Sequence, residues 1–506
     1  MLINFNAPID YRSWAEMNFG NNDFNDQRLT KRNVIIAEAL MTYPNMSISD
    51  LFPQSSDAIS AYRFFQNRKT PSDSVTKTHR DNTFHAIMQL GEQAQASGEK
   101  KPVVLLLGDT SEINFGYGRK IDGACPIGIS NQGQGFLFHA NLAFDWKAKQ
   151  IIGLASALIK DRTPRPKQKN GSKLASHKRV LLPDRESAVW MDSKKELEPL
   201  LDSVEMVCVN DRGADFYEHI HQLNQDGFSY VIRAGQKNRI VAPLEDPDQR
   251  ICLYEYICNQ PVQEEQTIEI TGQIVKNKKQ PYRMSPLLIR FGSILFLSSS
   301  VSSEVQGIQE PFQVNFVHIQ EDSSRAIDAH GKPCTVKEPV EWILLTNRPV
   351  TTIEEALEIR DMYQTRWLIE EYFCALKSGC GLEKSQLQNI NSLKTLCGFY
   401  SVCAVFILAL KYLQNCHPDT DVYTIIPKEW IIVLQQKLGM KFPIKTVRDF
   451  YIGVAKLGGY FNRKNDAPPG WKRIWKGFNK LLPLVDGYKL ALEIFPEKFF
   501  IDKRYV

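Results

Sequence analysis

The chain has 506 residues, of which 43% are hydrophobic and 24% charged, and its formal net charge is +5. This length allows two to four domains with ample core, and the composition is that of a soluble globular protein rather than a disordered or fibrous one. The mild positive charge permits binding to nucleic acid without requiring it.

The sequence gives no sign of export, membrane insertion or zinc binding. The first residues, Met1 to Asn6, lack the basic and apolar regions of a signal peptide, so we expect a cytoplasmic protein. The longest apolar stretch, Cys397 to Leu410, is too short to span a bilayer and predicts a buried core helix. The ten cysteines form no C-x-x-C pair, which favours reduced thiols and disfavours zinc.

The N-terminal block, residues 1–72, is predicted to be a helical domain that presents basic side chains. Pro71-Ser-Asp73 closes it with turn-forming residues, and a helix is expected from about Ser74 to Glu92. The basic side chains of interest in this block are Arg28, Arg32 and Arg63.

Two apolar runs downstream each end in an aspartate. Val103 to Asp109 and Val204 to Asp211 have the length and composition of buried strands. Acids that follow neighbouring strands can meet at one edge of a sheet, although aspartates also cap turns without any further role. Strand-like segments at 135–144 and 150–158, with a helix at 193–201, complete a mixed sheet covered by helices.

Between these elements and the later helices the chain carries two additions. Residues 160–179 hold eight Lys or Arg against one acid, which predicts a flexible basic loop. Between Asp211 and Glu370 lie 158 residues that contain segments alternating with the period of strands, at 228–233, 265–270, 287–291, 294–297 and 312–318. We therefore predict a β-rich insertion at about 228–345.

The most specific pattern is Y-x2-R-x3-E-x6-K, formed by Tyr363, Arg366, Glu370 and Lys377. In one continuous helix these offsets fall close to a single stripe. The arginine offers a planar fork and the lysine a point charge for phosphate groups, and the tyrosine offers a hydroxyl. An ordinary amphipathic helix with a charged outer face is the alternative.

Glu370 joins Asp109 and Asp211 as a third carboxylate. Such a set suits hard divalent cations, and we expect two Mg²⁺, with Mn²⁺ as the alternative. Two ions can activate an attacking oxygen and stabilise a leaving oxygen in phosphodiester chemistry. We expect Asp109 to bridge both ions.

This set of residues resembles the DDE transposases of bacterial insertion sequences, in particular the cut-and-paste branch that passes through a DNA hairpin. The similarity extends to the segments 14–20, 25–28, 61–65, 342–347 and 457–459. It implies a ribonuclease H-like catalytic domain at 73–416, an N-terminal DNA-binding domain and a helical C-terminal domain at 417–506. The C-terminal domain is expected to pair two protomers in a synaptic dimer on transposon ends and target DNA.

The resemblance also implies contacts with DNA for residues outside the three acids. Trp342 and Trp367 are expected to help extrude and stack a base, which recovers part of the lost stacking energy. Arg233 occupies the place of a DNA-contacting arginine, and Arg28, Arg32 and Arg63 lie in the DNA-binding block. Two other functions stay open: a ribonuclease H-like nuclease that only hydrolyses DNA, and an inactive transposase that acts as a DNA-binding repressor.

Overall fold

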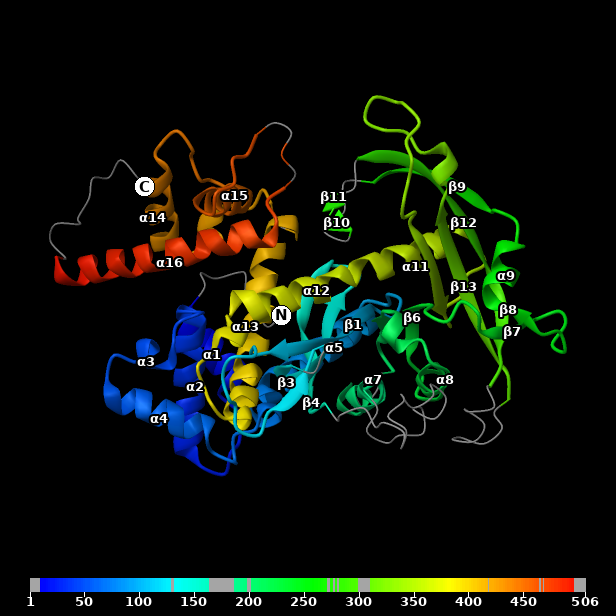
Figure 1. The fold of residues 1–506 in the computed structure, drawn as a ribbon. Coiled ribbons are helices and arrows are strands. Elements are labelled where there is room, and N and C mark those ends of the chain that lie inside the picture. The colour runs from blue at the N-terminus through cyan, green and yellow to red at the C-terminus, as the bar shows by residue number, and fades with distance from the viewer. Residues whose placement is uncertain are drawn as a thin grey trace.

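The computed structural model describes residues 10–128, 132–162, 186–197, 202–270, 274–275, 278–279, 282–298, 310–416, 418–463, 466 and 468–495. Residues 163–179 of the predicted basic loop at 160–179 lie outside the described residues. Figure 1 shows helical N- and C-terminal regions on one side of a sheet whose far strands extend away from them.

Four N-terminal helices precede a long fifth one: α1 (Tyr11–Phe19), α2 (Gln27–Thr42), α3 (Ile48–Leu51), α4 (Ser55–Phe65) and α5 (Ser72–Ala96). Asp10, Asp26 and Ser47 accept hydrogen bonds from backbone N–H groups at the starts of α1, α2 and α3, which satisfies donors that a helix leaves free. Aromatic residues of this region pack on the central helix α13, where the ring of Phe19 stacks on that of Phe399 at 5.4 Å.

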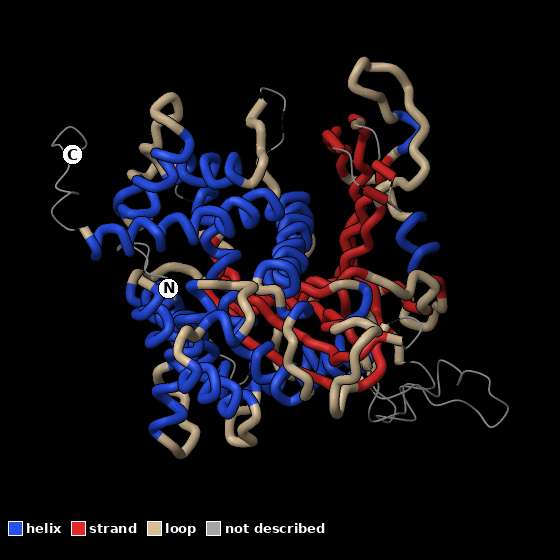
Figure 2. The backbone as a smooth tube through the Cα atoms, turned by 60° about the vertical axis from the view of Figure 1, so that its left-hand side comes forward, coloured by secondary structure: helices blue, strands red, loops and turns tan. Residues whose placement is uncertain are grey.

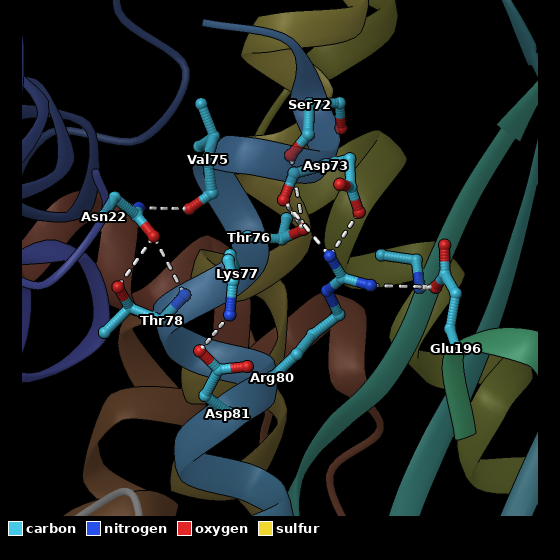
Figure 3. Close-up of polar contacts among 11 residues, drawn as sticks. Asn22, Ser72, Asp73, Val75, Thr76, Lys77, Thr78, Arg80, Asp81 and Glu196 are labelled. Carbon is cyan, nitrogen blue, oxygen red and sulfur yellow. Dashed lines mark hydrogen bonds and ion pairs between the residues drawn. The ribbon is translucent and has the colours of Figure 1, made fainter. Parts of the chain in front are cut away.

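Helix α5 connects the N-terminal helices to the region around Glu196, as Figure 3 shows. The Asn22 side chain donates to the Val75 carbonyl at 2.6 Å and accepts from the Thr78 N–H at 2.9 Å. Further along α5, Arg80 pairs with Asp73 on its own helix and with Glu196 at 3.1 Å. These contacts tie α5 to elements on both sides of it.

The central strands have the order β4-β3-β1-β5-β6. Their bounds are β1 (Val103–Asn114), β3 (Gly133–Asp145), β4 (Gln150–Lys160), β5 (Glu205–Asn210) and β6 (Ser229–Arg233), with a short β2 (Cys125–Ile127) beside β3. Strand β3 is antiparallel to both β1 and β4, whereas β5 is parallel to β1 and β6 is parallel to β5. This mixed sheet confirms the ribonuclease H-like fold class.

The strands between β6 and the signature helix continue the same sheet. They are β7 (Ile240–Pro243), β8 (Ile251–Cys252), β9 (Glu264–Ile270), β12 (Arg283–Phe296), β13 (Phe312–Glu321) and β14 (Glu341–Thr346), with helix α9 (Leu253–Cys258) and the small pair β10 (Ile274–Val275) and β11 (Lys278–Lys279). The two strands predicted at 287–291 and 294–297 are one strand, β12, because its pairing with β13 runs unbroken through Gly292. Figure 2 shows these strands rising as a narrow arm.

Helices cover both faces of the sheet. Side chains of β1 alternate between two cores: Leu105 and Leu107 point to one, and Val104 and Leu106 to the other. The first core receives α11 (Ile353–Thr365), α12 (Trp367–Cys374) and α13 (Ile390–Cys416), and the second receives α7 (Ala188–Asp192), the 3₁₀ turn η1 (Ser193–Leu197) and α8 (Tyr217–Gln225). The helix predicted from residue 193 is thus a short 3₁₀ turn as far as residue 197.

The C-terminal region contains α14 (Lys428–Leu438), α15 (Val447–Leu457) and α16 (Trp471–Ile494). The last helix continues through Pro483, and Leu481 and Val485 are buried on either side of the proline. In the described part of the chain, one helix, Ile390–Tyr412 of α13, has the length and hydropathy of a membrane span. It lies inside the protein with 94% of its apolar window buried, as expected for a core helix.

Candidate active site

Strand register brings Asp109 and Asp211 side by side. Strands β1 and β5 are parallel, and their last paired residues are Leu107 and Val209. Two residues further along each chain stand Asp109 and Asp211, on the same face as these two apolar residues, because side chains alternate along a strand. Both aspartates also bind local backbone: Asp109 Oδ1 accepts from the Thr110 N–H and Asp211 Oδ1 from the Gly213 N–H, each at 2.7 Å. Asp211 therefore caps a turn and also lies at the site.

Glu370 reaches this face from α12, which packs against β1. Its neighbour one turn earlier, Arg366, connects it to the strands: Nη2 lies 2.5 Å from Glu370 Oε1, and Nη1 lies 3.2 Å from Asp109 Oδ2. The Arg366 side chain is only 13% exposed. One buried guanidinium thus bridges a strand carboxylate and a helix carboxylate that lie 261 positions apart in the sequence.

The surroundings of Asp109 disfavour its negative charge. Burial, then the Asp211 carboxylate and to a smaller degree Glu370, together raise the pKa of Asp109 to about 6, against the lowering effects of Arg366 and the Thr110 N–H. The three carboxylates therefore interact electrostatically, and the single Arg366 guanidinium between them does not neutralise all three negative charges. Within the described ranges, no group of three His, Cys, Asp or Glu side chains is closed around one point as a finished metal site. The donor set, carboxylate oxygen only, fits a hard divalent cation.

The predicted helical stripe is interrupted twice. The chain passes from α11 to α12 at Arg366, whose N–H binds the Tyr363 carbonyl three residues back, and α12 ends in a π-helical turn, η4 (Ala375–Gly379). A wider turn rotates the residues that follow it, so Lys377 does not continue the straight 3.6-residue stripe. The Lys377 ammonium lies 3.9 Å from Glu383, in the 3₁₀ turn η5 (Leu382–Lys384).

The aromatic residues of the signature differ in exposure. Tyr363 is buried, and its ring packs edge-on against Trp342 of β14 with centroids 5.2 Å apart. The Arg366 guanidinium lies 5.8 Å from the Tyr363 ring centre. Trp367, by contrast, is 60% exposed at the start of α12. Of the two tryptophans, Trp367 has the freer aromatic face.

The remaining predicted DNA contacts lie in two places. Arg233 ends β6, one position after the pairing of Ile232 with Asn210, and donates to the Glu341 carbonyl at 3.0 Å. In the N-terminal helices Arg28 pairs with Asp26 and Arg32 with Asp57, each at 2.9 Å, while Arg63 is exposed near the end of α4. Arg233 therefore lies on the strand next to the one that Asp211 follows, whereas Arg28, Arg32 and Arg63 belong to the N-terminal helices.

Some supporting residues were not found from the sequence. Beside Asp109, the Thr110 hydroxyl is 2.8 Å from His139 Nδ1, and the buried His139 ring packs edge-on against Trp190 at 4.7 Å. Glu383 Oε1 accepts from the Asn114 N–H at the end of β1 at 2.9 Å. Nothing in the spacing of these residues marks them, because each meets its partner only through the folded sheet.

Two family models match the chain. Residues 11–70 match the transposase DNA-binding family, and residues 192–406 match the transposase DDE domain family. The chain therefore carries a region of the transposase DNA-binding family and a region of the transposase DDE domain family. Asp211 and Glu370 lie within the matched DDE region, and Asp109 precedes it. Arg28, Arg32 and Arg63 lie within the matched DNA-binding region.

Among the solved structures, the chain is similar to the piggyBac transposase synaptic complex with hairpin DNA, at 10% identity. The match covers 95% of this chain and 74% of that one, with a TM-score of 0.29. A TM-score this low supports no conclusion about function.

Proposed function

We propose that this protein is a transposase that moves an insertion sequence by a cut-and-paste reaction with a DNA hairpin intermediate. A water would nick one strand at the transposon end, and the freed 3′-hydroxyl would attack the opposite strand to form the hairpin. A second water would open the hairpin, and the 3′-hydroxyl would then attack target DNA. The main support is the register of β1 and β5, which sets Asp109 beside Asp211 beneath the helix that carries Glu370.

Asp109, Asp211 and Glu370 would hold two Mg²⁺, or Mn²⁺, through oxygen ligands alone. When bound, such ions supply the charge that activates an attacking oxygen and stabilises a leaving one. Arg366 keeps Asp109 and Glu370 together through its two ion pairs and can present its remaining N–H groups to a phosphate. Its burial limits its movement, so it orients the carboxylates as well as contacting DNA.

The other DNA contacts follow from charge and exposure. Lys377 is proposed to contact a phosphate beyond Glu370. Tyr363 is proposed to position Arg366 through the contact between its ring and the guanidinium. The exposed face of Trp367 would stack on an extruded base, with Trp342 supporting Tyr363 from β14. Arg28, Arg32, Arg63 and Arg233 are proposed to contact the transposon end. We further propose that two protomers, joined through α14–α16, hold a pair of ends.

The decisive test uses the purified protein, magnesium and duplexes that carry the inverted repeats flanking its coding sequence. We expect nicked, hairpin and target-joined products on denaturing gels. Asp109→Asn should lower the nicking rate by at least about a thousandfold, because it removes a carboxylate from the metal site.

Asp145→Asn is the matched control. Asp145 also ends a central strand and caps the following turn, with its Oδ1 accepting from the Lys147 and Ala148 N–H groups at 2.9 Å. Its loss should change nicking by less than about twofold. Cleavage without hairpin or joined products would favour the hydrolysis-only nuclease. DNA binding without any cleavage would favour the repressor, and unchanged nicking in Asp109→Asn would remove the metal assignment.

A further inference from the structure

The DNA-binding region touches the end of the signature helix through one side chain. Asn45, in the loop between α2 and α3, donates from Nδ2 to the Gly379 carbonyl at 2.6 Å. Gly379 closes the π-helical turn η4, and the last carbonyls of a helix have no partner within the helix. Asn45 therefore satisfies a backbone group that the turn itself leaves open.

The two segments that meet at this contact, around Asn45 and around Gly381, fit closely together. Asn45 adopts a left-handed conformation with φ of 75°, which asparagine tolerates better than most residues. On the other side Gly381 has φ of 70°, and a Cβ there would lie 2.2 Å from Asn45 Oδ1. A side chain at position 381 would thus push the loop away from η4.

The turn that Asn45 holds is also fixed on its other side. Following Gly381, Glu383 accepts from the Asn114 N–H at the end of β1 and lies 3.9 Å from the Lys377 ammonium. Strand β1 is the strand that carries Asp109. Lys377 therefore sits on a π-helical turn held between the DNA-binding region and the strand of the first aspartate, and such turns often occur at functional sites.

We propose that Asn45 is a positioning residue for Lys377. The hydrogen bond from Asn45 holds η4 in place and thereby fixes the position of the Lys377 ammonium relative to the DNA. When a transposon end binds to the N-terminal helices, the Lys377 ammonium is then aligned beside Glu370. This inference rests on the proposed function, since it assumes that Lys377 contacts the DNA being cut.

The test is a double-mutant cycle on nicking of pre-bound transposon ends at saturating protein. Asn45→Gly keeps the left-handed backbone accessible and removes only the amide donor. We expect it to slow nicking about tenfold, the effect of losing one hydrogen bond, and to change the Kd for the end by less than about twofold. In a Lys377→Ala background the same substitution should slow nicking by less than about twofold, because the two residues act as a unit.

Asn462→Gly is the control, since Asn462 is another left-handed asparagine, in the loop after α15. It should leave nicking unchanged. Additive effects of Asn45→Gly and Lys377→Ala, or a rate loss matched by an equal loss of DNA affinity, would overturn the positioning role. Wild-type nicking by Asn45→Gly would overturn it too. A wild-type protein that cuts no DNA would instead overturn the proposed function, and this inference with it.

Discussion

At the scale of single residues, Arg366 is the group around which the carboxylates are arranged. Its guanidinium spans Asp109 and Glu370, and its burial leaves little room for another geometry. The sequence predicted that Arg366 belongs to the site but assigned it to phosphate alone. Its bridging role depends on the distance between β1 and α12, which no local pattern encodes.

We predict that Arg366→Lys lowers the nicking rate by about ten- to a hundredfold, because an ammonium cannot form the two-pronged contact of a guanidinium. The affinity for transposon ends should fall far less. Measurements of rate and Kd on the same duplex separate the two effects. Arg360→Lys is the matched control on α11, where Arg360 pairs with Asp361 at 2.8 Å. Equal losses in both variants would contradict the bridging role.

At the scale of elements, the strands were predicted better than the turns between helices. The continuous apolar runs of β1 and β5 predict strands that are buried on both faces, and each run ends shortly before its aspartate, Asp109 or Asp211. The break at Arg366 and the π-helical turn at Ala375–Gly379 were missed, because helical, 3₁₀ and π turns share the same residue preferences. Tertiary contacts such as the Asn45 cap decide between them.

The arm formed by β12 and β13 has a buried ion pair at the end where β12 begins and β13 stops. Arg283 Nε lies 2.5 Å from Glu321 Oε1, with side chains 5% and 0% exposed, and Glu321 Oε2 also accepts from the Val340 N–H at 2.7 Å. Burial by itself raises the pKa of Glu321, but Arg283 and the Val340 N–H outweigh it and hold the pKa below its ordinary value of 4.5.

We predict that Glu321→Gln destabilises the protein by about 3–5 kcal/mol at pH 7, because it leaves Arg283 buried without its charge partner. A lowered carboxyl pKa stabilises the fold fully above the ordinary value of 4.5, and that contribution is lost as the pH falls through the lowered pKa. The stability gap between wild type and variant, measured by chemical denaturation, should therefore narrow below pH 4.5. A gap that widens on acidification would show that the pair is not ionic.

At the scale of the whole molecule, α13 is the common core of three regions. The sequence predicted it as a buried helix, but its partners are distant in the chain and could not be read from its own pattern. Its Thr395 hydroxyl donates to the Thr70 carbonyl at 2.8 Å, and the ring of Phe406 packs on Trp14. Residues of α15 also belong to the same core.

Gly398 of α13 lies close to Ser72 at the start of α5: a Cβ at position 398 would lie 2.9 Å from Ser72 Oγ and 3.1 Å from the Ser72 carbonyl oxygen. We predict that Gly398→Ala destabilises the protein by about 1–3 kcal/mol through overpacking. Gly487→Ala on α16 meets nothing within 4 Å and should stabilise it by up to about 1 kcal/mol, since alanine favours helix. The melting temperatures of both variants, compared with wild type, test this prediction. Shifts of the melting temperature in the same direction for both would contradict the packing argument.

The pairing of the strands links the arm mechanically to the strands of the two aspartates. Strand β14 pairs with β6, β6 with β5 and β5 with β1, so the arm and the aspartate strands share one unbroken ladder of backbone hydrogen bonds. A hinge between them would require several of these bonds to rupture together. Under the proposed function, a force that DNA exerts on the arm would therefore reach Asp109 and Asp211 through these paired strands.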